Sequence, residues 1–517
     1  MSMWSEVSCE VSDALPQPNN DLFYGFRKRK IEAIASYLDE AFKQTVAFFN
    51  NKLKYLGCRT LTPEERIDYL FENNLRKGYV SIRNTETSLV FFEFEFQGNI
   101  VPISIEIPYL INECVVYNDT RYYPLFPIVE KGGVNVTDDG KIIVKVMRIP
   151  ITFGRRSSDK RMLQAVSGNQ YWDLLLTVKI YQGAVSKLGE RIPLVLYHLC
   201  RKGFHETMRL YRIPEGSITV TATADPKDTT WEYFMLPNGL YIKALKEKMT
   251  DIHFKRMVIS LFELFVVNST FAIDDVVGNS TEYYCTTLGR YIGSKNKDTP
   301  VNMLILNNAW KHLDMTDLML DGVSQKKLAS VGINVNDTYD LLLYMYFNID
   351  RLIISYNPLD IYEKTIGSLD HLMAGIIREI SKKQYNVINS KRGANLTLEV
   401  IKTFCKKASQ RASWIGTTSI FRPEPSVYND CWLLTVGAKR FMMLDSVESQ
   451  YGGRKRPTKP PPALLRAHPS QIACFSVLDI PASTPIATGS LNPYLQIDEE
   501  GNVIKSKYAK YIEHVFD

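Results

Sequence analysis

Apolar residues recur every three or four positions near the start of the chain. The series includes Ile34, Leu38, Phe42 and Val46. This spacing places the apolar side chains on one side of a helix, with polar side chains on the other. Residues 31–49 are therefore predicted to form an amphipathic helix that packs against a core.

Strict alternation of apolar and polar positions replaces this spacing further along. Phenylalanines alternate with glutamates over residues 92–96, and after a short turn isoleucines alternate with polar residues over 103–107. Successive side chains of a strand point to opposite faces, so the pattern predicts a hairpin with one apolar face. A second strand pair is predicted at 132–136 and 141–146, joined by a turn at 138–140.

The two kinds of pattern are mixed in the middle of the chain and become helical beyond it. A strand is predicted at 217–224 and a buried helix at 251–267, within a second mixed module that covers about residues 155–337. Two periodic stretches, 339–352 and 368–381, predict helices that each bury one apolar stripe. The pattern as a whole predicts an α+β protein with more than one domain.

The amino-acid composition changes from Pro423 onward. The most distinct part of this segment is a glycine pair, Gly452 and Gly453, followed by a run of lysine, arginine and proline that ends at Pro462. Prolines stiffen the chain and cannot continue a helix, while the basic side chains favour solvent. Residues 452–462 are therefore predicted to form an exposed basic loop.

Length and composition agree with a folded protein of several domains. The chain has 517 residues, of which 45% are hydrophobic and 23% charged, and this length is a soft indication of about three domains. The first ten residues have neither the basic end nor the apolar core of a signal peptide. The longest apolar stretch, 257–267, is much shorter than the roughly 20 residues that span a bilayer. We expect neither secretion nor a membrane span.

Cysteine and histidine give no sign of a metal site. The eight cysteines and seven histidines are scattered, with no cysteine pair at zinc-knuckle spacing and no histidine pair four residues apart. We expect reduced cysteines in a cytosolic compartment. A phosphate-binding P-loop and a dinucleotide fingerprint are also missing from the sequence, and adjacent acidic pairs such as Asp274 and Asp275 rarely converge on one metal ion.

Positive charge is concentrated in one part of the chain. Residues 382–468 contain sixteen lysines and arginines against five aspartates and glutamates, a balance of +11 within a chain whose formal charge is +6. Such a cluster is the electrostatic signature of a protein that binds a phosphate backbone. A solvated helix surface followed by an exposed basic loop would give the same composition, so both interpretations stay open.

A series of short motifs near the C-terminal end resembles the fork region of bacterial RNA polymerase β subunits. Residues 437–444 (GAKRFMML) resemble the family's HKRRISAL stretch, and Gly452-Gly453 with the basic loop stand where the family has a Gly-Gly and a TRER loop. Residues 465–470 (LRAHPS) resemble RDVHPT. Finally, 478–481 (LDIP) and 489–492 (GSLN) resemble the family's IETP and INSL, in the same order.

Weaker similarity extends upstream in the order that the family requires. It includes residues 133–150, 357–371 and 403–417. Two departures are clear: the family's Pro-Glu-Gly-Pro-Asn is replaced by residues 482–486 (ASTPI), and Lys141 stands where the family has glutamate. The nucleotide contacts and inhibitor binding of the family therefore do not carry over to these positions.

The resemblance implies a fold and an enzyme. The chain is similar to the split β-like subunits of the multisubunit RNA polymerases of phiKZ-like giant bacteriophages, and of their virion and non-virion forms we expect the non-virion form. The implied domains are a protrusion-like domain at 1–154, a lobe-like domain at 155–338, a protrusion-like return at 339–418 and a fork-like segment at 419–517. The implied activity is DNA-directed RNA polymerase, a nucleotidyltransferase, with this chain as one subunit.

The same resemblance implies partners and a location. The implied partners are a separate C-terminal β-like subunit, β′-like subunits, a phage-specific promoter-recognition subunit, template DNA and nascent RNA, with no membrane. We expect this chain to contribute no catalytic residue and to bind no cofactor, and we expect magnesium on the Asp cluster of a β′-like subunit. The implied location is the cytoplasm of the infected bacterial host, or a phage-made compartment within it.

Basic side chains are the candidate nucleic-acid-binding residues, because lysine and arginine contacts position phosphates. The candidates in the fork-like segment are Lys439, Arg440, Arg454, Lys455, Arg456, Lys459 and Arg466. A second group precedes them and consists of Lys391, Arg392, Lys402, Lys406 and Lys407. Trp414 and Trp432 could stack on bases, but we expect them to pack in the core.

Two other functions also fit these residues. The chain could be a noncatalytic accessory or promoter-recognition subunit that binds nucleic acid through its basic loop. It could also be a structural phage protein whose basic segment binds packaged DNA. The first alternative needs no complementary β half, and the second predicts self-assembly without polymerase subunits.

Overall fold

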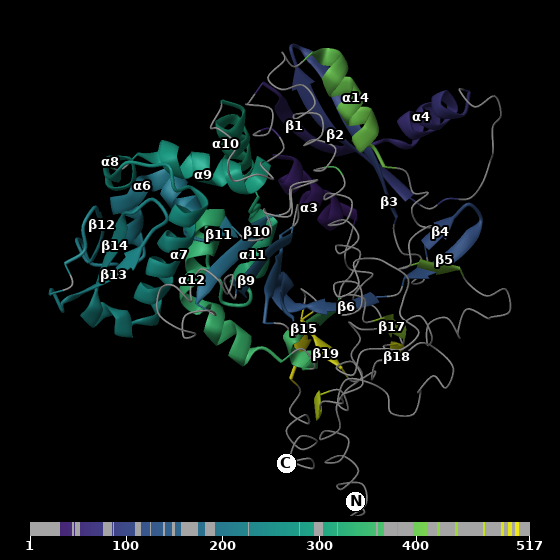
Figure 1. Cartoon of the computed structure of the whole chain (residues 1–517). Coiled ribbons are helices and arrows are strands. Elements are labelled where there is room, and N and C mark those ends of the chain that lie inside the picture. The colour runs from purple at the N-terminus through teal and green to yellow at the C-terminus, as the bar shows by residue number, and fades with distance from the viewer. Residues whose placement is uncertain are drawn as a thin grey trace, which may run out of the picture. The chain divides into compact units, whose positions relative to one another are not determined.

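Helices and strands are interspersed along the described chain in the computed structural model (Figure 1). The structure describes residues 31–43, 52–75, 87–108, 115–146, 150–156, 174–180, 192–293, 303–366 and 397–410, apart from single residues and pairs within these ranges. It also describes the short segments 421–423, 440–442, 469–470, 488–490, 495–498 and 502–505, and the isolated residues Val46, Thr85 and Ile380. The mixture of helices and sheets confirms the predicted α+β class.

The chain divides into two compact units, one inserted into the other. The first unit combines Met1–Lys131 with Asn357–Asp517, and the second is Gly132–Tyr356. The inserted unit is wider than the range 155–338 that we predict for the lobe-like domain. Strands before residue 155 pair with strands after it, and one helix continues through residue 355. The identification of the units as protrusion-like and lobe-like stays a prediction.

In the first unit, a three-stranded antiparallel sheet contains the predicted hairpin. Its order is β1 (Lys54–Thr60), β2 (Thr87–Phe96) and β3 (Asn99–Pro108), with Phe92 opposite Ile103. Gln97 and Gly98 form the turn, with φ of 52° and 79°. Both central residues of a tight hairpin turn of this kind need a positive φ, which glycine adopts without strain.

The apolar face of this sheet packs against helix α3 (Ile31–Lys43). The Phe42 ring lies 4.7 Å from the Phe92 ring and 5.9 Å from the Phe94 ring, between centroids. Phe92 and Phe94 are fully buried and Phe42 nearly so. Helix and hairpin are thus the two sides of one small core, as the two apolar patterns predict.

Helix α4 (Pro63–Leu75) is attached to the same sheet by polar contacts and one ring contact. Thr62 and Glu65 form a reciprocal cap at its start, in which the Thr62 amide donates to Glu65 Oε2 at 3.0 Å and the Glu65 amide donates to Thr62 Oγ1 at 3.3 Å. Tyr69 packs edge-on against Phe91 and its hydroxyl lies 3.1 Å from Ser104 Oγ.

The first unit also contains three sheets of shorter strands. The first contains β4 (Val115–Tyr117), β5 (Thr120–Pro124) and β16 (Phe421–Pro423). The second has the order β15 (Lys364–Ile366), β6 (Phe126–Glu130), β17 (Arg440–Met442) and β18 (Thr488–Ser490). The third is the hairpin of β19 (Gln496–Ile497) and β20 (Val503–Ile504). Two of these sheets pair segments from both ends of the chain, which explains why the first unit is discontinuous.

The inserted unit contains two antiparallel sheets. The larger has the order β11 (Ile192–Pro193), β10 (Leu175–Ile180), β9 (Pro150–Arg156), β8 (Ile142–Lys145) and β7 (Val134–Val136). The smaller has the order β12 (Ile218–Thr221), β14 (Tyr241–Leu245) and β13 (Trp231–Met235). The predicted strand pair around residues 132–146 is confirmed as β7 and β8, and the predicted strand at 217–224 as the shorter β12.

Helices pack against these sheets and share one core with them. They are α6 (Leu196–Leu210), α7 (Ile252–Val267), α8 (Ile273–Val277), α9 (Thr281–Gly293), α10 (Met303–Asp317), α11 (Gly322–Ala329) and α12 (Thr338–Ser355). Asp251 caps α7 by accepting a hydrogen bond from the His253 amide at 2.9 Å. The predicted buried helix at 251–267 is confirmed as α7, most of whose side chains are buried.

The remaining helix predictions have different outcomes. Helix 339–352 is confirmed as α12, and the described part of helix 31–49 is confirmed as α3. Helix 368–381 lies outside the described residues except for the helical Ile380. The predicted basic loop 452–462 also lies outside them. Within the described residues, no helix is both long enough and apolar enough to cross a membrane.

Candidate nucleic-acid interface

Helix α14 (Leu398–Ala408) carries three of the predicted nucleic-acid-binding residues. Lys402, Lys406 and Lys407 are all exposed to solvent. Lys402 and Lys406 are four residues apart, about 6 Å along the helix axis, so they project from the same side of the helix. The structure therefore brings these three candidates together on one exposed surface, which we call the α14 lysine face.

The opposite side of α14 is apolar and buried. Ile401, Phe404, Cys405 and Ala408 are each at most 1% exposed. Thr397 caps the helix, since its Oγ1 accepts a hydrogen bond from the Val400 amide at 3.4 Å. The alternation of buried apolar and exposed basic positions orients the lysines away from the core.

Strand β3 holds the C-terminal end of α14 through main-chain hydrogen bonds. The Gln410 amide donates to the Ser104 carbonyl at 2.9 Å, and the Glu106 amide donates to the Gln410 carbonyl at 3.1 Å. The Ser104 amide donates to Ser409 Oγ at 3.0 Å. Ile105 and Gln410, about 300 positions apart in the sequence, thus pair as in a parallel sheet. This pairing attaches the segment after α14 to strand β3 (Figure 1).

Helix stability explains only part of this lysine arrangement. Lys406 and Lys407 lie in the last turn, where a positive charge interacts favourably with the helix dipole by about 0.3–1 kcal/mol. Lys402 lies in the middle of the helix and gains little from that effect. The surrounding sequence is also basic, with eight lysines and arginines and one glutamate in residues 382–411. The predicted phosphate-binding role is compatible with the exposed positions of all three lysines.

Arg440 is the one candidate of the fork-like segment that lies in a described element. It is the first residue of strand β17, which pairs in parallel with β6 and antiparallel with β18. Its main chain is therefore fixed in a sheet, opposite Ser490. The other predicted contacts lie outside the described residues: Lys391, Arg392, Lys439, Arg454, Lys455, Arg456, Lys459 and Arg466. Trp414 and Trp432 do as well.

The motifs of the fork-like segment meet at the place where the chain returns to the first unit. Ser470, from the motif LRAHPS, is buried and its Oγ accepts a hydrogen bond from the Ile361 amide at 3.0 Å. Thr365 Oγ1 donates to Asn502 Oδ1 at 2.7 Å. Together with the β17–β18 pair, these contacts gather parts of three separate motifs around residues 360–366 and their sheet.

A buried ion pair lies at the neck of the inserted unit, where the chain leaves the first unit and re-enters it, and no pattern in the sequence indicates this pair. Lys364 Nζ lies 2.5 Å and 2.6 Å from the two carboxylate oxygens of Glu130. The side chains are 2% and 7% exposed. Glu130 precedes the insertion and Lys364 follows it, so this neck pair joins the outgoing and returning chain segments. No local pattern distinguishes either residue from an ordinary surface charge.

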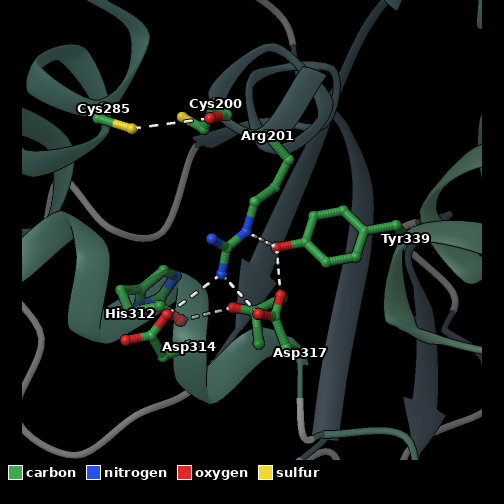
Figure 2. A network of polar contacts seen from close by, with 8 residues as sticks. Cys200, Arg201, Cys285, His312, Asp314, Asp317 and Tyr339 are labelled. Carbon is green, nitrogen blue, oxygen red and sulfur yellow. Dashed lines mark hydrogen bonds and ion pairs between the residues drawn. The ribbon is translucent and has the colours of Figure 1, made fainter. Parts of the chain in front are cut away.

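A second polar network joins three helices of the inserted unit (Figure 2). The Arg201 guanidinium on α6 donates to Asp317 Oδ2 at 2.5 Å and to Asp314 Oδ1 at 3.3 Å, both on α10. Its Nε donates to the Tyr339 hydroxyl of α12 at 3.2 Å, and that hydroxyl donates to Asp317 Oδ1 at 2.7 Å. Burial raises the pKa of Asp317, although the bonds from Tyr339 and Arg201 oppose this rise. The network links α6, α10 and α12 by hydrogen bonds and ion pairs.

Two histidines near this network are buried and bonded to tyrosines. His312 Nε2 lies 2.8 Å from the Tyr197 hydroxyl, and His198 Nδ1 lies 2.9 Å from the Tyr211 hydroxyl. Burial lowers the pKa of His198 to about 3 and that of His312 to about 4. Both side chains are therefore neutral at physiological pH, and each forms a buried hydrogen bond inside the core.

The described residues do not provide a metal centre. Among them, no group of three or more histidine, cysteine, aspartate or glutamate side chains is placed to hold a metal ion. Asp274 and Asp275 lie on the short helix α8, where Asp275 instead accepts a hydrogen bond from the Ala272 amide at 2.9 Å. The Asp275 carboxylate therefore stabilises the N-terminus of α8.

Comparison with known proteins gives one family. The model of the family described as "Non-virion RNA polymerase subunit" matches residues 6–412. The matched range includes the whole inserted unit and α14, and it ends before the fork-like segment 419–517. No curated protein matches the chain.

Proposed function

Since this chain belongs to the family of non-virion RNA polymerase subunits, we propose that it is the N-terminal β-like subunit of that enzyme. The family confirms the expectation of a non-virion phage polymerase. The chain is thus a subunit of a phage RNA polymerase that works with other polymerase subunits and nucleic acid. Its place within the enzyme is our proposal.

In this proposal, the chain forms one wall of the cleft for DNA and the DNA–RNA hybrid. The first unit supplies the protrusion-like and fork-like parts, and the inserted unit supplies the lobe-like part. Support comes from the discontinuous first unit and from the meeting of fork-like motifs around residues 360–366. A separate C-terminal β-like subunit and β′-like subunits complete the cleft.

The α14 lysine face is the observation that carries the nucleic-acid part of this proposal. Three exposed lysines on a helix that is fixed to a sheet can position phosphates without reordering the main chain. Such contacts hold DNA or RNA at a defined distance from the cleft wall and carry no sequence information. Arg440 and the basic candidates outside the described residues are further proposed contacts for nucleic acid.

The catalytic step would take place on another subunit. RNA synthesis needs carboxylates that converge on magnesium, and the described residues offer no such set. We therefore assign the magnesium-binding Asp cluster to a β′-like subunit. The enzyme would act in the cytoplasm of the infected bacterial host, or in a phage-made compartment there, with a promoter-recognition subunit as a further partner.

Purification of the complex tests the proposed function. A tagged copy of the chain, recovered from infected cells, is expected to bring with it β′-like chains and a C-terminal β-like chain, and to support RNA synthesis on a DNA template. Mass spectrometry and nucleotide incorporation measure these two properties. Recovery with polymerase subunits that already include a complete β would favour the accessory role. Recovery alone or with capsid proteins would contradict the proposal.

Substitution of two α14 lysines tests the interface itself. Lys402→Ala combined with Lys406→Ala is expected to weaken retention of duplex DNA by the assembled enzyme, because two phosphate contacts are lost. For two contacts, the slope of log affinity against log salt should become smaller by about 1.8. The measurement is DNA retention over a series of salt concentrations.

A matched pair of lysines provides the control for that experiment. Lys326→Ala combined with Lys327→Ala removes the same charge from exposed positions of α11 in the inserted unit. This control is expected to leave the salt slope close to that of the wild-type enzyme. Equal slopes for the α14 variant and the wild-type enzyme would exclude α14 from the interface.

A further inference from the structure

The outward face of the small sheet β12–β14–β13 in the inserted unit carries an aromatic cluster. Strand β13 contributes Trp231, Tyr233 and Met235 to this face. Strand β14 contributes Tyr241 and Lys243. Tyr233 lies opposite Lys243 and Met235 opposite Tyr241. Because side chains alternate between the two faces of a sheet, these five residues share one face. We call it the aromatic sheet face.

Packing of the core does not account for these side chains. The inward face of the same sheet contributes Ile218, Val220, Phe234, Ile242 and Ala244 to the core of the unit. Within the described part of the chain, the four aromatic and apolar members of the aromatic sheet face belong neither to that core nor to the partly buried residues packed against it. Met235 is 62% exposed. Apolar surface gathered outside a core marks a binding surface.

Lys243 gives this face a fixed positive charge. Its Nζ lies over the Trp231 ring, 4.2 Å from the centroid. This cation–π contact orders the lysine side chain before any partner arrives, so pairing with a carboxylate would lose less side-chain entropy. The face thus combines three partly exposed aromatic side chains and one exposed methionine with one oriented cation.

The charges around the face favour protein over nucleic acid as the partner. Residues 225–248 contain four lysines, and also four aspartates and glutamates, so their charges balance. A surface that binds a phosphate backbone needs an excess of positive charge, as α14 and its flanking sequence have. Tryptophan, tyrosine and methionine are instead enriched in the centres of protein interfaces, where charged residues are depleted.

We propose that the aromatic sheet face binds another protein subunit of the polymerase, through an apolar patch that presents a carboxylate to Lys243. This inference rests on the proposed function for the presence of other polymerase subunits. It assigns separate roles to two surfaces of the chain. The α14 lysine face contacts nucleic acid, and the aromatic sheet face contacts protein.

A charge placed at Met235, the most exposed apolar member of the face, tests this assignment. Met235→Glu, in the full chain within the assembled enzyme, is expected to reduce recovery of one polymerase subunit at least tenfold, because a carboxylate would be buried in an apolar contact and would repel the partner's own carboxylate. The measurement is subunit stoichiometry by mass spectrometry after purification through the tagged chain. The matched control is Ile354→Glu, on α12 of the same unit, whose apolar side chain is 83% exposed. The control should retain all subunits.

Site-specific photocrosslinking identifies the partner class and does not depend on how well the variant folds. A photoreactive amino acid at position 235 of the assembled enzyme is expected to form an adduct with a polymerase subunit, whereas one at position 354 is not. An adduct with DNA or RNA, or no adduct at position 235, would overturn the proposal. So would equal subunit recovery by Met235→Glu and the wild-type chain.

These outcomes separate this inference from the proposed function. If the wild-type chain is recovered with polymerase subunits and synthesises RNA while position 235 reaches no subunit, the sheet-face proposal fails alone. If the wild-type chain brings down no polymerase subunit, the proposed function fails first.

Discussion

Replacement of Glu130 with alanine is expected to lower the free energy of unfolding of the first unit by about 3–5 kcal/mol, the loss typical of breaking a buried ion pair. The variant leaves the buried ammonium of Lys364 without this carboxylate, which otherwise lies 2.5 Å away. Chemical denaturation measures the loss. Hydrogen exchange should locate it in β6 and β15, the strands that the neck pair joins.

Two further variants separate the neck pair from an ordinary surface ion pair. Glu130→Leu combined with Lys364→Met replaces both charges by apolar groups of similar size, and is expected to be neutral or stabilising by up to about 4 kcal/mol. Glu93→Ala removes the partly exposed carboxylate that Arg59 contacts at 2.8 Å, and is expected to change stability by at most about 1 kcal/mol. If Glu130→Ala were as mild as Glu93→Ala, the neck pair would not be a buried ion pair in solution.

Acidification is expected to destabilise the inserted unit well before its carboxylates are fully protonated. A histidine in an unfolded chain binds its proton near pH 6.5, but burial lowers the pKa of His198 to about 3 and of His312 to about 4 in the folded unit. Between those values the unfolded chain holds more protons, so the free energy of unfolding falls as the pH is lowered. Each histidine should contribute a loss on the order of 3 kcal/mol between pH 6.5 and 4.

Comparison of two variants assigns this pH dependence to His312. His312→Gln removes the titrating group, so the free energy of unfolding should fall less steeply between pH 6 and 5, by about 1 kcal/mol per pH unit. Tyr197→Phe removes the hydroxyl that lies 2.8 Å from His312 Nε2 but keeps the histidine, so it should lower stability at each pH and preserve the slope. Denaturation at several pH values, with amide exchange of α6 and α10 as the local probe, measures both effects. An unchanged slope in His312→Gln would contradict the burial of a neutral histidine.

Local periodicity was sufficient to predict the elements with one buried side. The hairpin of β2 and β3 was predicted because Phe92, Phe94 and Ile103 alternate with polar residues. Helices α7 and α12 were predicted from the apolar spacing of a helix. In each case the core selects apolar residues at the period of the element, so the period is visible in the sequence.

The candidate interface was only partly predictable. The lysines of α14 were singled out because they belong to a basic part of the chain. Their common exposed side could be inferred only once the helix and its buried residues Ile401 and Phe404 were known. The main-chain hydrogen bonds that Gln410 donates to Ser104 and accepts from Glu106 leave no pattern in either segment, because such bonds require no particular side chain.

The sequence by itself determined the α+β class, the main helices and strands, the basic character of residues 382–468 and the family that the chain resembles. These properties depend on residues close together along the chain, or on motif order. Only the tertiary structure decided that Glu130 and Lys364 form the neck pair and that Trp231, Tyr233 and Tyr241 remain outside the core. Both facts depend on which distant segments are neighbours and which face of a sheet is covered. That choice is made by the packing of the whole unit, since neither an ion pair across 234 residues nor a partly exposed sheet face has a local signature.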